Sequence, residues 1–187
     1  MATKYTEVKT TGSIEWAKIF ETNRDMTGYE GAYVDFEGAY TVQQILSKDE
    51  YTKLQAAGTQ KKPNQKRLMD GELMLKFERK HKITSRDGKV IPQAGGAPKV
   101  MNADGTAWDK EVNGLIGNGS TGNVMVYCSP YEIKLPNGKV SKSGISTMLI
   151  AVQVTDLVRY ERKSENFVDF DVEGASVDTD QSEEAMF

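Results

Sequence analysis

The sequence predicts an all-β protein: a small closed barrel of about five antiparallel strands with one short helix. Several segments alternate apolar and polar residues with a period of two, which is typical of half-buried strands. Only one segment carries both a helix start and a helix stop signal. Because strands and helices do not alternate along the chain, a parallel sheet of β-α-β units is disfavoured, and a closed antiparallel barrel is the better interpretation.

The alternating segments define the predicted strands. They span residues 13–20, 32–46 with a bend or bulge at Gly38, 72–80, 124–129 and 145–159. Trp16 in the first strand is either a core residue or a stacking platform, and core packing is favoured because large aromatic residues usually serve packing. Residues 22–31 and 92–106 are expected to be loops.

The one predicted helix runs from Lys48 to Ala57. Ser47 and Glu50 form the S-x-x-E capping pattern, good helix formers follow, and Gly58 ends the run. Two tight turns are predicted where Asp-Gly occurs at 87–88 and Asn-Gly at 137–138. The second of these turns connects the last two long strands.

A glycine-rich stretch precedes the strand at 124–129. Gly117, Gly119 and Gly122 have the spacing G-x-G-x-x-G, which in a dinucleotide site is followed by a helix. Here a strand follows, so a dinucleotide site is disfavoured. A glycine loop that joins two strands and bends sharply or approaches a ligand closely is the better interpretation, and a plain turn without a ligand is the alternative.

Charge divides the chain into three parts, which we predict to be a flexible arm (1–12), one barrel domain (13–163) and a disordered acidic tail (164–187). The tail holds eight of the 27 acidic residues and no Lys or Arg, a formal charge of −8. All 24 Lys and Arg residues lie in the first 163 residues against 19 acids, a formal charge of +5. A basic body with an acidic tail is expected when the body binds a polyanion.

Composition disfavours several other classes of protein. No run of about eighteen apolar residues and no leader pattern occurs, so a soluble, intracellular protein is expected. The single cysteine, Cys128, and the single histidine, His81, predict neither a disulfide nor a metal site, and no cofactor is expected. A nuclease needs clustered carboxylates, and the closest acid pair, Asp169 with Asp171, lies in the tail. We therefore predict a binding protein and not an enzyme.

Binding of single-stranded nucleic acid requires spaced cations and aromatic faces for base stacking. Tyr131 leads the aromatic candidates because a Pro-Tyr pair at a strand end holds the ring near a loop. The full aromatic set is Tyr131, Trp108 and Tyr127. The candidate cations flank predicted loops or lie on the polar side of the strand at 72–80; they are Lys61, Lys62, Lys66, Arg67, Lys76, Lys80, Lys134, Lys139 and Lys142. Strand-end packing for Tyr131 and a solvated loop for residues 60–67 are the alternatives.

Two parts of the sequence resemble one family, the replication single-stranded DNA-binding proteins of T-odd short-tailed phages. Residues 115–160 share the family's order of hydrophobic pair, Gly-x-Gly loop, alternating strand, Pro-Tyr, basic loop and long apolar strand. The last five residues, Glu183-Glu184-Ala185-Met186-Phe187, match its acidic tail ending in phenylalanine, and residues 13–57 show a weaker likeness. The predicted helix precedes the third strand, whereas many OB-folds carry theirs between strands three and four.

The resemblance implies an OB-fold and sequence-independent coating of single-stranded DNA in phage DNA replication, recombination and repair. It places the family's base-stacking tyrosine at Tyr131 and assigns partner binding to Glu183, Glu184 and Phe187, which would recruit the phage DNA polymerase and helicase-primase. It also implies a homodimer in the host cytoplasm. The tail is expected to occupy the DNA groove until DNA displaces it. The alternatives are a phage structural or neck protein with a β-barrel fold and an RNA-binding protein.

Overall fold

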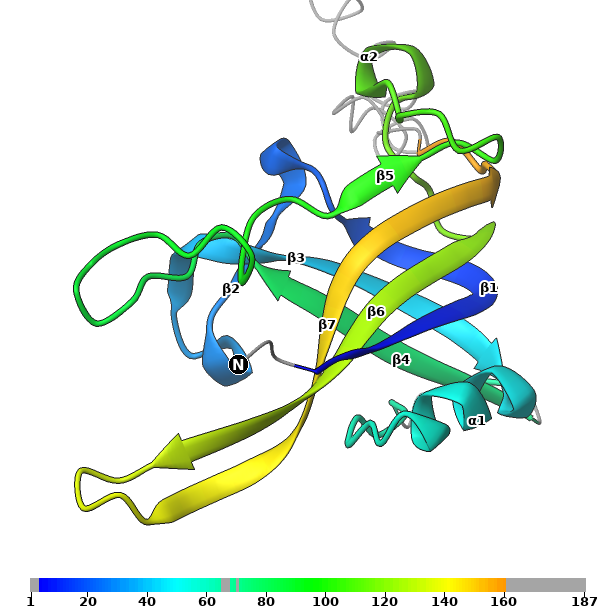
Figure 1. Cartoon of the computed structure of the whole chain (residues 1–187). Coiled ribbons are helices and arrows are strands. Elements are labelled where there is room, and N and C mark those ends of the chain that lie inside the picture. Colours follow the sequence, from blue (N-terminus) through cyan, green and yellow to red (C-terminus); the bar gives the residue numbers. More distant parts are fainter. Residues whose placement is uncertain (1–3, 65–67, 70, 161–187) are drawn as a thin grey trace, which may run out of the picture.

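The computed structural model describes residues 4–64, 68–69 and 71–160 (Figure 1). Within these ranges the chain forms seven strands: β1 (Thr6–Lys18), β2 (Asp25–Thr27), β3 (Val34–Ser47), β4 (Glu72–Lys80), β5 (Lys99–Met101), β6 (Ser120–Lys134) and β7 (Val140–Asp156). The helical elements are two 3-10 turns and two α-helices: η1 (Glu21–Asn23), η2 (Tyr29–Gly31), α1 (Lys48–Ala56) and α2 (Lys110–Asn113). No helix in the described ranges is long and apolar enough to cross a membrane.

The five long strands close into a barrel. Around the ring the order is β1, β6, β7, β4 and β3, and β3 pairs with β1 again. This is the five-stranded Greek-key barrel of an OB-fold, as predicted. The expectation that every pair is antiparallel is wrong, because β4 and β7 run parallel and pair at Glu78 and Met148. Alternating directions cannot close around a ring with an odd number of strands, so one parallel pair is unavoidable.

The helix prediction is confirmed to within one residue. The Ser47 hydroxyl accepts a hydrogen bond from the Glu50 backbone N–H at 3.3 Å, as the capping pattern predicts. Helix α1 lies between β3 and β4, which are the second and third strands of the barrel. Its Leu54 is fully buried against the core.

The predicted flexible arm is strand from Thr6 onwards. Residues Thr6 to Ile14 pair with β6. The hydrophobic alternation is absent because Thr10, which points inward, is polar and is satisfied inside the barrel. Its hydroxyl donates to Gln44 Oε1 at 2.6 Å, and Gln44 Nε2 donates to the Thr10 and Gly122 carbonyl oxygens at 3.2 and 3.1 Å. A buried polar pair can therefore hide a strand from a search for apolar periodicity.

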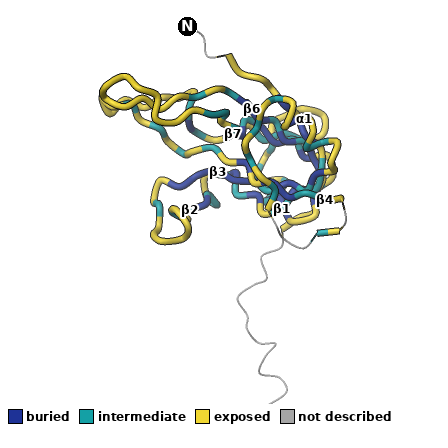
Figure 2. The backbone as a smooth tube through the Cα atoms, turned by 90° about the horizontal axis from the view of Figure 1, so that it is seen from below, coloured by how far each residue is buried: buried dark blue, intermediate teal, exposed yellow. Residues whose placement is uncertain are grey.

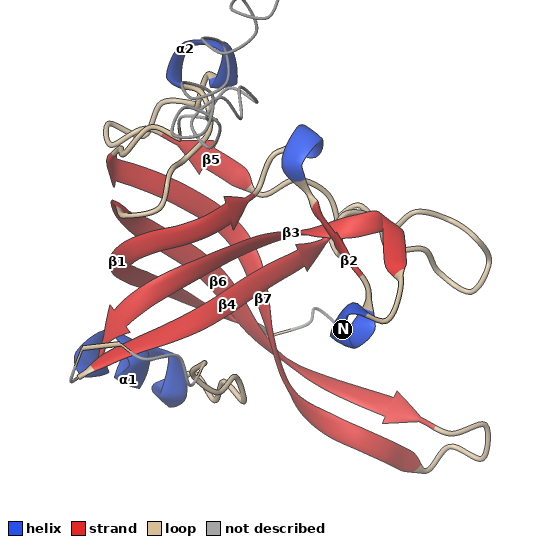
Figure 3. Ribbon diagram, turned by 180° about the vertical axis from the view of Figure 1, so that it is seen from behind, coloured by secondary structure: helices blue, strands red, loops and turns tan. Residues whose placement is uncertain are grey.

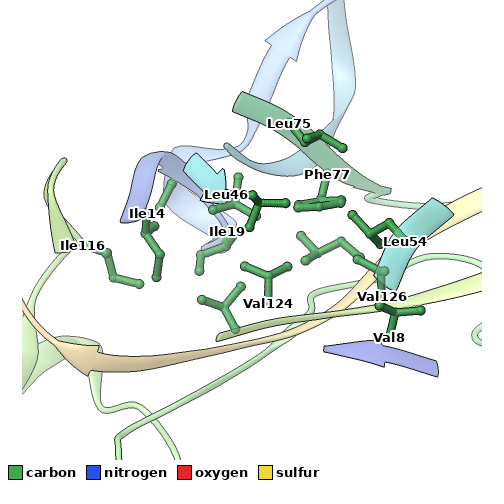
Figure 4. Close-up of a cluster of buried hydrophobic side chains, with 14 of the residues drawn as sticks. Val8, Ile14, Ile19, Leu46, Leu54, Leu75, Phe77, Ile116, Val124 and Val126 are labelled. Atoms are coloured by element: carbon green, nitrogen blue, oxygen red, sulfur yellow. The ribbon is translucent and has the colours of Figure 1, made fainter. Parts of the chain in front are cut away.

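Inward-facing side chains of all five barrel strands form one core (Figure 4). Phe77, Val124 and Leu149 are completely buried, and Ile116 from the glycine loop joins them at one end. Fully burying one such side chain contributes about 1.5 to 3 kcal/mol. The predicted inward face of β4 is confirmed, since Leu75 and Phe77 are buried and Leu73 packs beside them.

Glycines in β1 and β6 allow the barrel to close tightly. Gly12 and Gly122 lie opposite each other in the β1–β6 register. A Cβ atom at Gly12 would lie less than 3.0 Å from the Ile45 carbonyl oxygen, and one at Gly122 would approach the Gln153 carbonyl oxygen as closely. The glycine-rich stretch therefore leads into a strand, as predicted, and the close approach at Gly122 is to a neighbouring strand.

Several segments project from the barrel on the side away from α1, and two of them concern the candidate site (Figures 1 and 3). One is the end of the β6–β7 hairpin, whose predicted turn is confirmed by the hydrogen bond from Leu135 N–H to the Lys139 carbonyl at 2.9 Å. The other is the connection from β1 to β3, residues 19–33, which contains β2. The hairpin end is exposed, whereas the connection 19–33 is mixed, with Ile19 and Asp25 buried (Figure 2).

Candidate nucleic-acid interface

Tyr131 lies at the root of the β6–β7 hairpin. It pairs with Gly144 of β7, and its Cε1 atom is 3.1 Å from the position that a Cβ atom at Gly144 would occupy. The side-chain amide of Gln60 approaches the same position. The missing side chain at Gly144 therefore leaves room for the Tyr131 ring and the Gln60 amide on one face of the hairpin.

Residues 59–64, which we call the strap, lie between the diverging ends of β4 and β7. The hydroxyls of Thr59 and Thr147 are hydrogen-bonded at 2.7 Å, and Asn64 N–H donates to the Met74 carbonyl oxygen at 2.7 Å. The Tyr51 hydroxyl donates to the Lys61 carbonyl oxygen at 3.0 Å. These bonds tie the strap to α1, β4 and β7, so its backbone is held beside the hairpin root.

Lys61 and Lys76 lie close together on the outside of the barrel. Burial lowers the pKa of the Lys61 ammonium, the Glu78 carboxylate partly offsets this, and the like charge of Lys76 lowers it further. Lys76 lies on the face of β4 opposite to Leu75 and Phe77, and it is exposed. A bound phosphate would be attracted to both ammonium groups and would offset the repulsion between them.

Asp25 of β2 joins Lys76 to Lys18 of β1. Lys18 Nζ lies 3.5 Å from Asp25 Oδ1, and Lys76 Nζ lies 3.2 Å from Asp25 Oδ2. Burial alone would raise the pKa of Asp25, but hydrogen bonds from Thr27 and Lys76 and the charge of Lys18 lower it to about 2. The carboxylate is therefore ionised at neutral pH and holds two cations in place.

These contacts form a continuous path over the outside of the barrel, from the hairpin across β4 and β3 to β1. We call Tyr131, Gln60, Lys61, Lys76 and Lys18, in this order, the basic strip. It runs over β7, β4 and β3 between Tyr131 on β6 and Lys18 on β1. One end offers an aromatic ring and the amide of Gln60, and the rest offers three lysines.

The other predicted cations lie on the strap, on β4 and on the β6–β7 hairpin, or outside the described residues. Lys62 is exposed on the strap next to Lys61, and Lys80 is exposed on the same face of β4 as Lys76. Lys142 pairs with Ile133 and shares the Tyr131 face of the hairpin, whereas Lys134 lies on the other face, 3.8 Å from Glu132. Lys139 lies in the hairpin turn. The structure does not describe Lys66 and Arg67, nor the tail residues Glu183, Glu184 and Phe187.

Tyr127 shares the outer face of β6 with Tyr131. Its ring stacks on Tyr5 with centroids 4.1 Å apart and an interplanar angle of 22°. Sequence reasoning missed Tyr5 because it lies in the segment interpreted as a flexible arm. Tyr131 follows Tyr127 by four positions, which places the two residues roughly 13 Å apart along the strand.

Trp108 does not belong to this surface. It is half-buried against the core, and its indole N–H donates to the Gly114 carbonyl oxygen at 3.1 Å. The neighbouring α2 lies at the end of the molecule opposite to the hairpin (Figure 1). The structure thus gives Trp108 a packing role in place of the stacking role predicted from the sequence.

Sequence reasoning missed several exposed aromatic residues. Trp16, for which core packing was favoured, is 55% exposed. Tyr29, Tyr33 and Phe36, between β2 and the start of β3, are 74%, 60% and 81% exposed. Only Tyr29 lay in the predicted loop, where an apolar ring has no strand face to bury; Tyr33 and Phe36 lay in the predicted strand 32–46, whose pattern does not show that its start is exposed.

His81 lies between two carboxylates. Its Nε2 is 3.3 Å from Glu21 Oε1, and its Nδ1 is 3.0 Å from Glu37 Oε2. The Tyr40 hydroxyl donates to Glu21 at 2.6 Å, and burial together with this carboxylate raises the pKa of Tyr40 to about 12. Across the described part of the chain, no three His, Cys, Asp or Glu side chains gather in a way that fits a metal ion.

The Asp25→Asn variant is expected to lose stability and to gain affinity for a polyanion. Loss of the buried carboxylate removes charge-assisted bonds, so the free energy of unfolding should fall by roughly 1 to 3 kcal/mol at pH 7. The same change frees Lys18 and Lys76 for phosphate, so binding of oligo-dT should tighten. Thermal melting and fluorescence anisotropy measure the two effects, and a variant that binds more weakly would contradict the role given to Asp25.

The stability difference should depend on pH. Because the pKa of Asp25 in the folded protein is lowered from 3.8 to about 2, its stabilising contribution is complete above about pH 5 and is lost as the pH falls towards 2. The difference in melting temperature between the two proteins should therefore shrink over this range. A constant difference down to pH 2 would contradict the lowered pKa.

No protein-family model and no curated protein sequence matches the chain. Among solved structures it is similar to gp2.5, a single-stranded DNA binding protein encoded by bacteriophage T7, with a TM-score of 0.51, 17% identity, and coverage of 89% of this chain and 100% of that chain. The single-stranded DNA-binding protein of bacteriophage Enc34 in complex with ssDNA gives a TM-score of 0.47 at 12% identity, covering 83% of this chain and 88% of that one. The C-terminal truncation of the Enc34 protein gives a TM-score of 0.46 at 12% identity, covering 84% of this chain and 88% of that chain.

At these identities the likeness shows the fold alone. The phage resemblance seen in the sequence is thus confirmed at the level of the OB-type barrel.

Proposed function

We propose that this chain binds single-stranded DNA without reading its base sequence. The observation that carries the proposal is the basic strip, where the Tyr131 ring lies beside Gln60 and the next residue, Lys61, lies close to Lys76. A ring on which any base can stack, beside cations that follow the backbone, is the arrangement used for sequence-independent single-strand binding. The proposed role is binding, with no catalytic step.

The position of the strip on the barrel supports the proposal. OB-folds bind oligonucleotides on the face of their second and third strands and in the connections from strand one to two and from strand four to five. Here those strands are β3 and β4, and those connections are residues 19–33 and the β6–β7 turn. The T7 protein with the same fold is named as a single-stranded DNA binding protein.

The proposal is tested by fluorescence anisotropy of labelled oligo-dT over a salt series, with duplex DNA and oligo-U as competitors. Binding to oligo-dT should be tight and should weaken as salt rises, because each neutralised phosphate lowers the slope of log K against log salt by about 0.7. The Lys61→Gln/Lys76→Gln variant loses two phosphate contacts, so its slope should be less negative by about 1.4. Lys48→Gln, at the start of α1, is the matched control.

Equal binding to duplex DNA, or an unchanged slope in the double variant, would refute single-strand binding by this strip. Preference for oligo-U would move the proposal to RNA.

The biological setting is a further part of the proposal. The sequence resemblance supports a role in phage DNA replication, recombination and repair, in the host cytoplasm and as a homodimer. We place recruitment of the phage polymerase and helicase-primase in the acidic tail, through Phe187 and its neighbouring acids. The charge of −8 on residues 164–187 against +5 on the rest supports competition between this tail and DNA for the basic strip.

Deleting residues 164–187 is expected to tighten binding of oligo-dT and to abolish recruitment of those partners. The gain in affinity should be largest at low salt, because the competing tail is held by charge and is screened as salt rises. Anisotropy on the intact and truncated chains measures the effect. If both chains bound oligo-dT equally at low salt, the competition would be refuted.

A further inference from the structure

Trp16 occupies a backbone conformation that a bulky side chain rarely adopts. Its φ is +48°, in the left-handed region that favours glycine and asparagine. The register of β1 against β3 shifts between Glu15 and Lys18. This extra residue is a β-bulge, which turns Ile14, Ala17 and Ile19 into the core and turns Trp16 outward.

The bulge is held by the glycine loop before β6. Trp16 N–H donates to Asn118 Oδ1 at 2.7 Å. Gly119 N–H approaches both the Ile14 carbonyl oxygen and Glu15 Oε1, each at 3.1 Å. Strain at an exposed aromatic residue that neighbouring groups enforce in this way points to a function for the ring, since packing would place it in the core.

Trp16 lines a pocket of about 540 Å³ between β1, α2 and the end of the described chain. The residues around it include two aromatic rings, two lysines and several side-chain hydrogen-bonding groups, with Ile116 buried beneath; the main ones are Trp16, Tyr160, Lys18, Lys110, Asn118 and Ile116. None of the described residues that line it is acidic. The Lys110 ammonium is held in place by the Thr22 hydroxyl. An aromatic pocket with only positive charge suits a flat ligand that carries an anion.

The pocket is continuous with the basic strip. Lys18 lines it and is also paired with Asp25, which holds Lys76. A strand that begins on Tyr131 and follows Lys61, Lys76 and Lys18 therefore arrives at Trp16.

We propose that this pocket binds a nucleobase of the same single strand, stacked on Trp16, with its phosphates at Lys18 and Lys110. The inference rests on the proposed function and extends it by a second stacking site beyond the Lys18 end of the basic strip. Charge favours this occupant because the lining is positive and a nucleotide combines a flat ring with an anion. The acidic tail with Phe187 is the competing occupant, and the test separates the two.

The test uses the fact that the chain has only two tryptophans. In the Trp108→Phe variant Trp16 is the sole tryptophan, so its emission reports on the pocket alone. Titration with unlabelled oligo-dT should change the Trp16 emission with the same midpoint as the anisotropy. Oligomers too short to reach from Tyr131 to Trp16 should bind without this change.

A second variant removes the ring without adding strain. Trp16→Gly suits the positive φ, so its melting temperature should not fall below that of the wild type. Its affinity for long oligo-dT should fall about five- to a hundredfold, its affinity for the shortest oligomers should not change, and Trp16→Tyr should keep most of the binding.

Binding by anisotropy with an unchanged Trp16 emission, or full affinity in Trp16→Gly, would overturn the pocket proposal and leave the proposed function intact. A Trp16 emission that changes on deletion of residues 164–187 but does not respond to oligo-dT in the truncated chain would assign the pocket to the tail and overturn the nucleobase proposal. Absence of binding by both readouts would overturn the proposed function together with this inference.

Discussion

Replacing Tyr131 by alanine should weaken the binding of oligo-dT about five- to a hundredfold, because stacking of one base on an aromatic ring contributes about 1 to 3 kcal/mol. The ring lies at the hairpin root beside Gln60 and above Gly144, at the end of the basic strip. Anisotropy at fixed salt measures the loss. The slope against salt should stay unchanged, because no cation is removed.

Two variants make the Tyr131 result specific. Tyr131→Phe keeps the ring and should keep most of the affinity. Trp108→Phe changes an aromatic residue that packs against the core, away from the strip, and should leave binding unchanged. Wild-type affinity in Tyr131→Ala would remove Tyr131 from the interface, whereas an equal loss in Trp108→Phe would mean that the predicted face is the wrong one.

Replacing Gly12 by alanine should destabilise the barrel by several kcal/mol. The added Cβ atom would lie less than 3.0 Å from the Ile45 carbonyl oxygen, which is backbone of the neighbouring strand β3 and cannot move aside as a side-chain end would. Relief of the overlap requires β1 to separate from β3, which opens the pairing that closes the ring. Urea or thermal unfolding measures the loss.

Gly138→Ala is the matched control for Gly12→Ala. Gly138 lies in the hairpin turn with a φ of +80° and has open space around it, so its substitution adds backbone strain without overlap. A loss of about 1 kcal/mol is expected there. Similar losses in the two variants would contradict the steric account of barrel closure.

Local sequence patterns predicted the strands, the helix and the turns. The period of two located β4 at its observed bounds, and the Ser47–Glu50 pattern located α1, because alternation and capping depend on residues only a few positions apart. The same reasoning failed at Thr6–Gly12, where an inward-facing threonine is satisfied by Gln44. Local pattern does not reveal a polar pair whose members are 34 residues apart.

Part of the candidate interface was also readable from the sequence. Tyr131, Lys61 and Lys76 were expected on chemical grounds; the structure brings Lys61 close to Lys76 and places the Tyr131 ring beside Gln60, the residue before Lys61. Trp108 was expected with them, but it lies elsewhere and packs against the core. Residue type indicates what a side chain can do, whereas its availability depends on what packs over it.

The sequence by itself determined that the protein is a β-barrel with one helix, a basic body and an acidic tail, since these follow from periodicity, capping and net charge. Only the tertiary structure decided that the strap meets β7 across 85 residues of sequence, that Asp25 holds two cations and that Trp16 is turned outward. Each of these depends on which strands become neighbours. Closing the ring sets those neighbours, because β1 must pair with both β3 and β6, and no local segment carries that information.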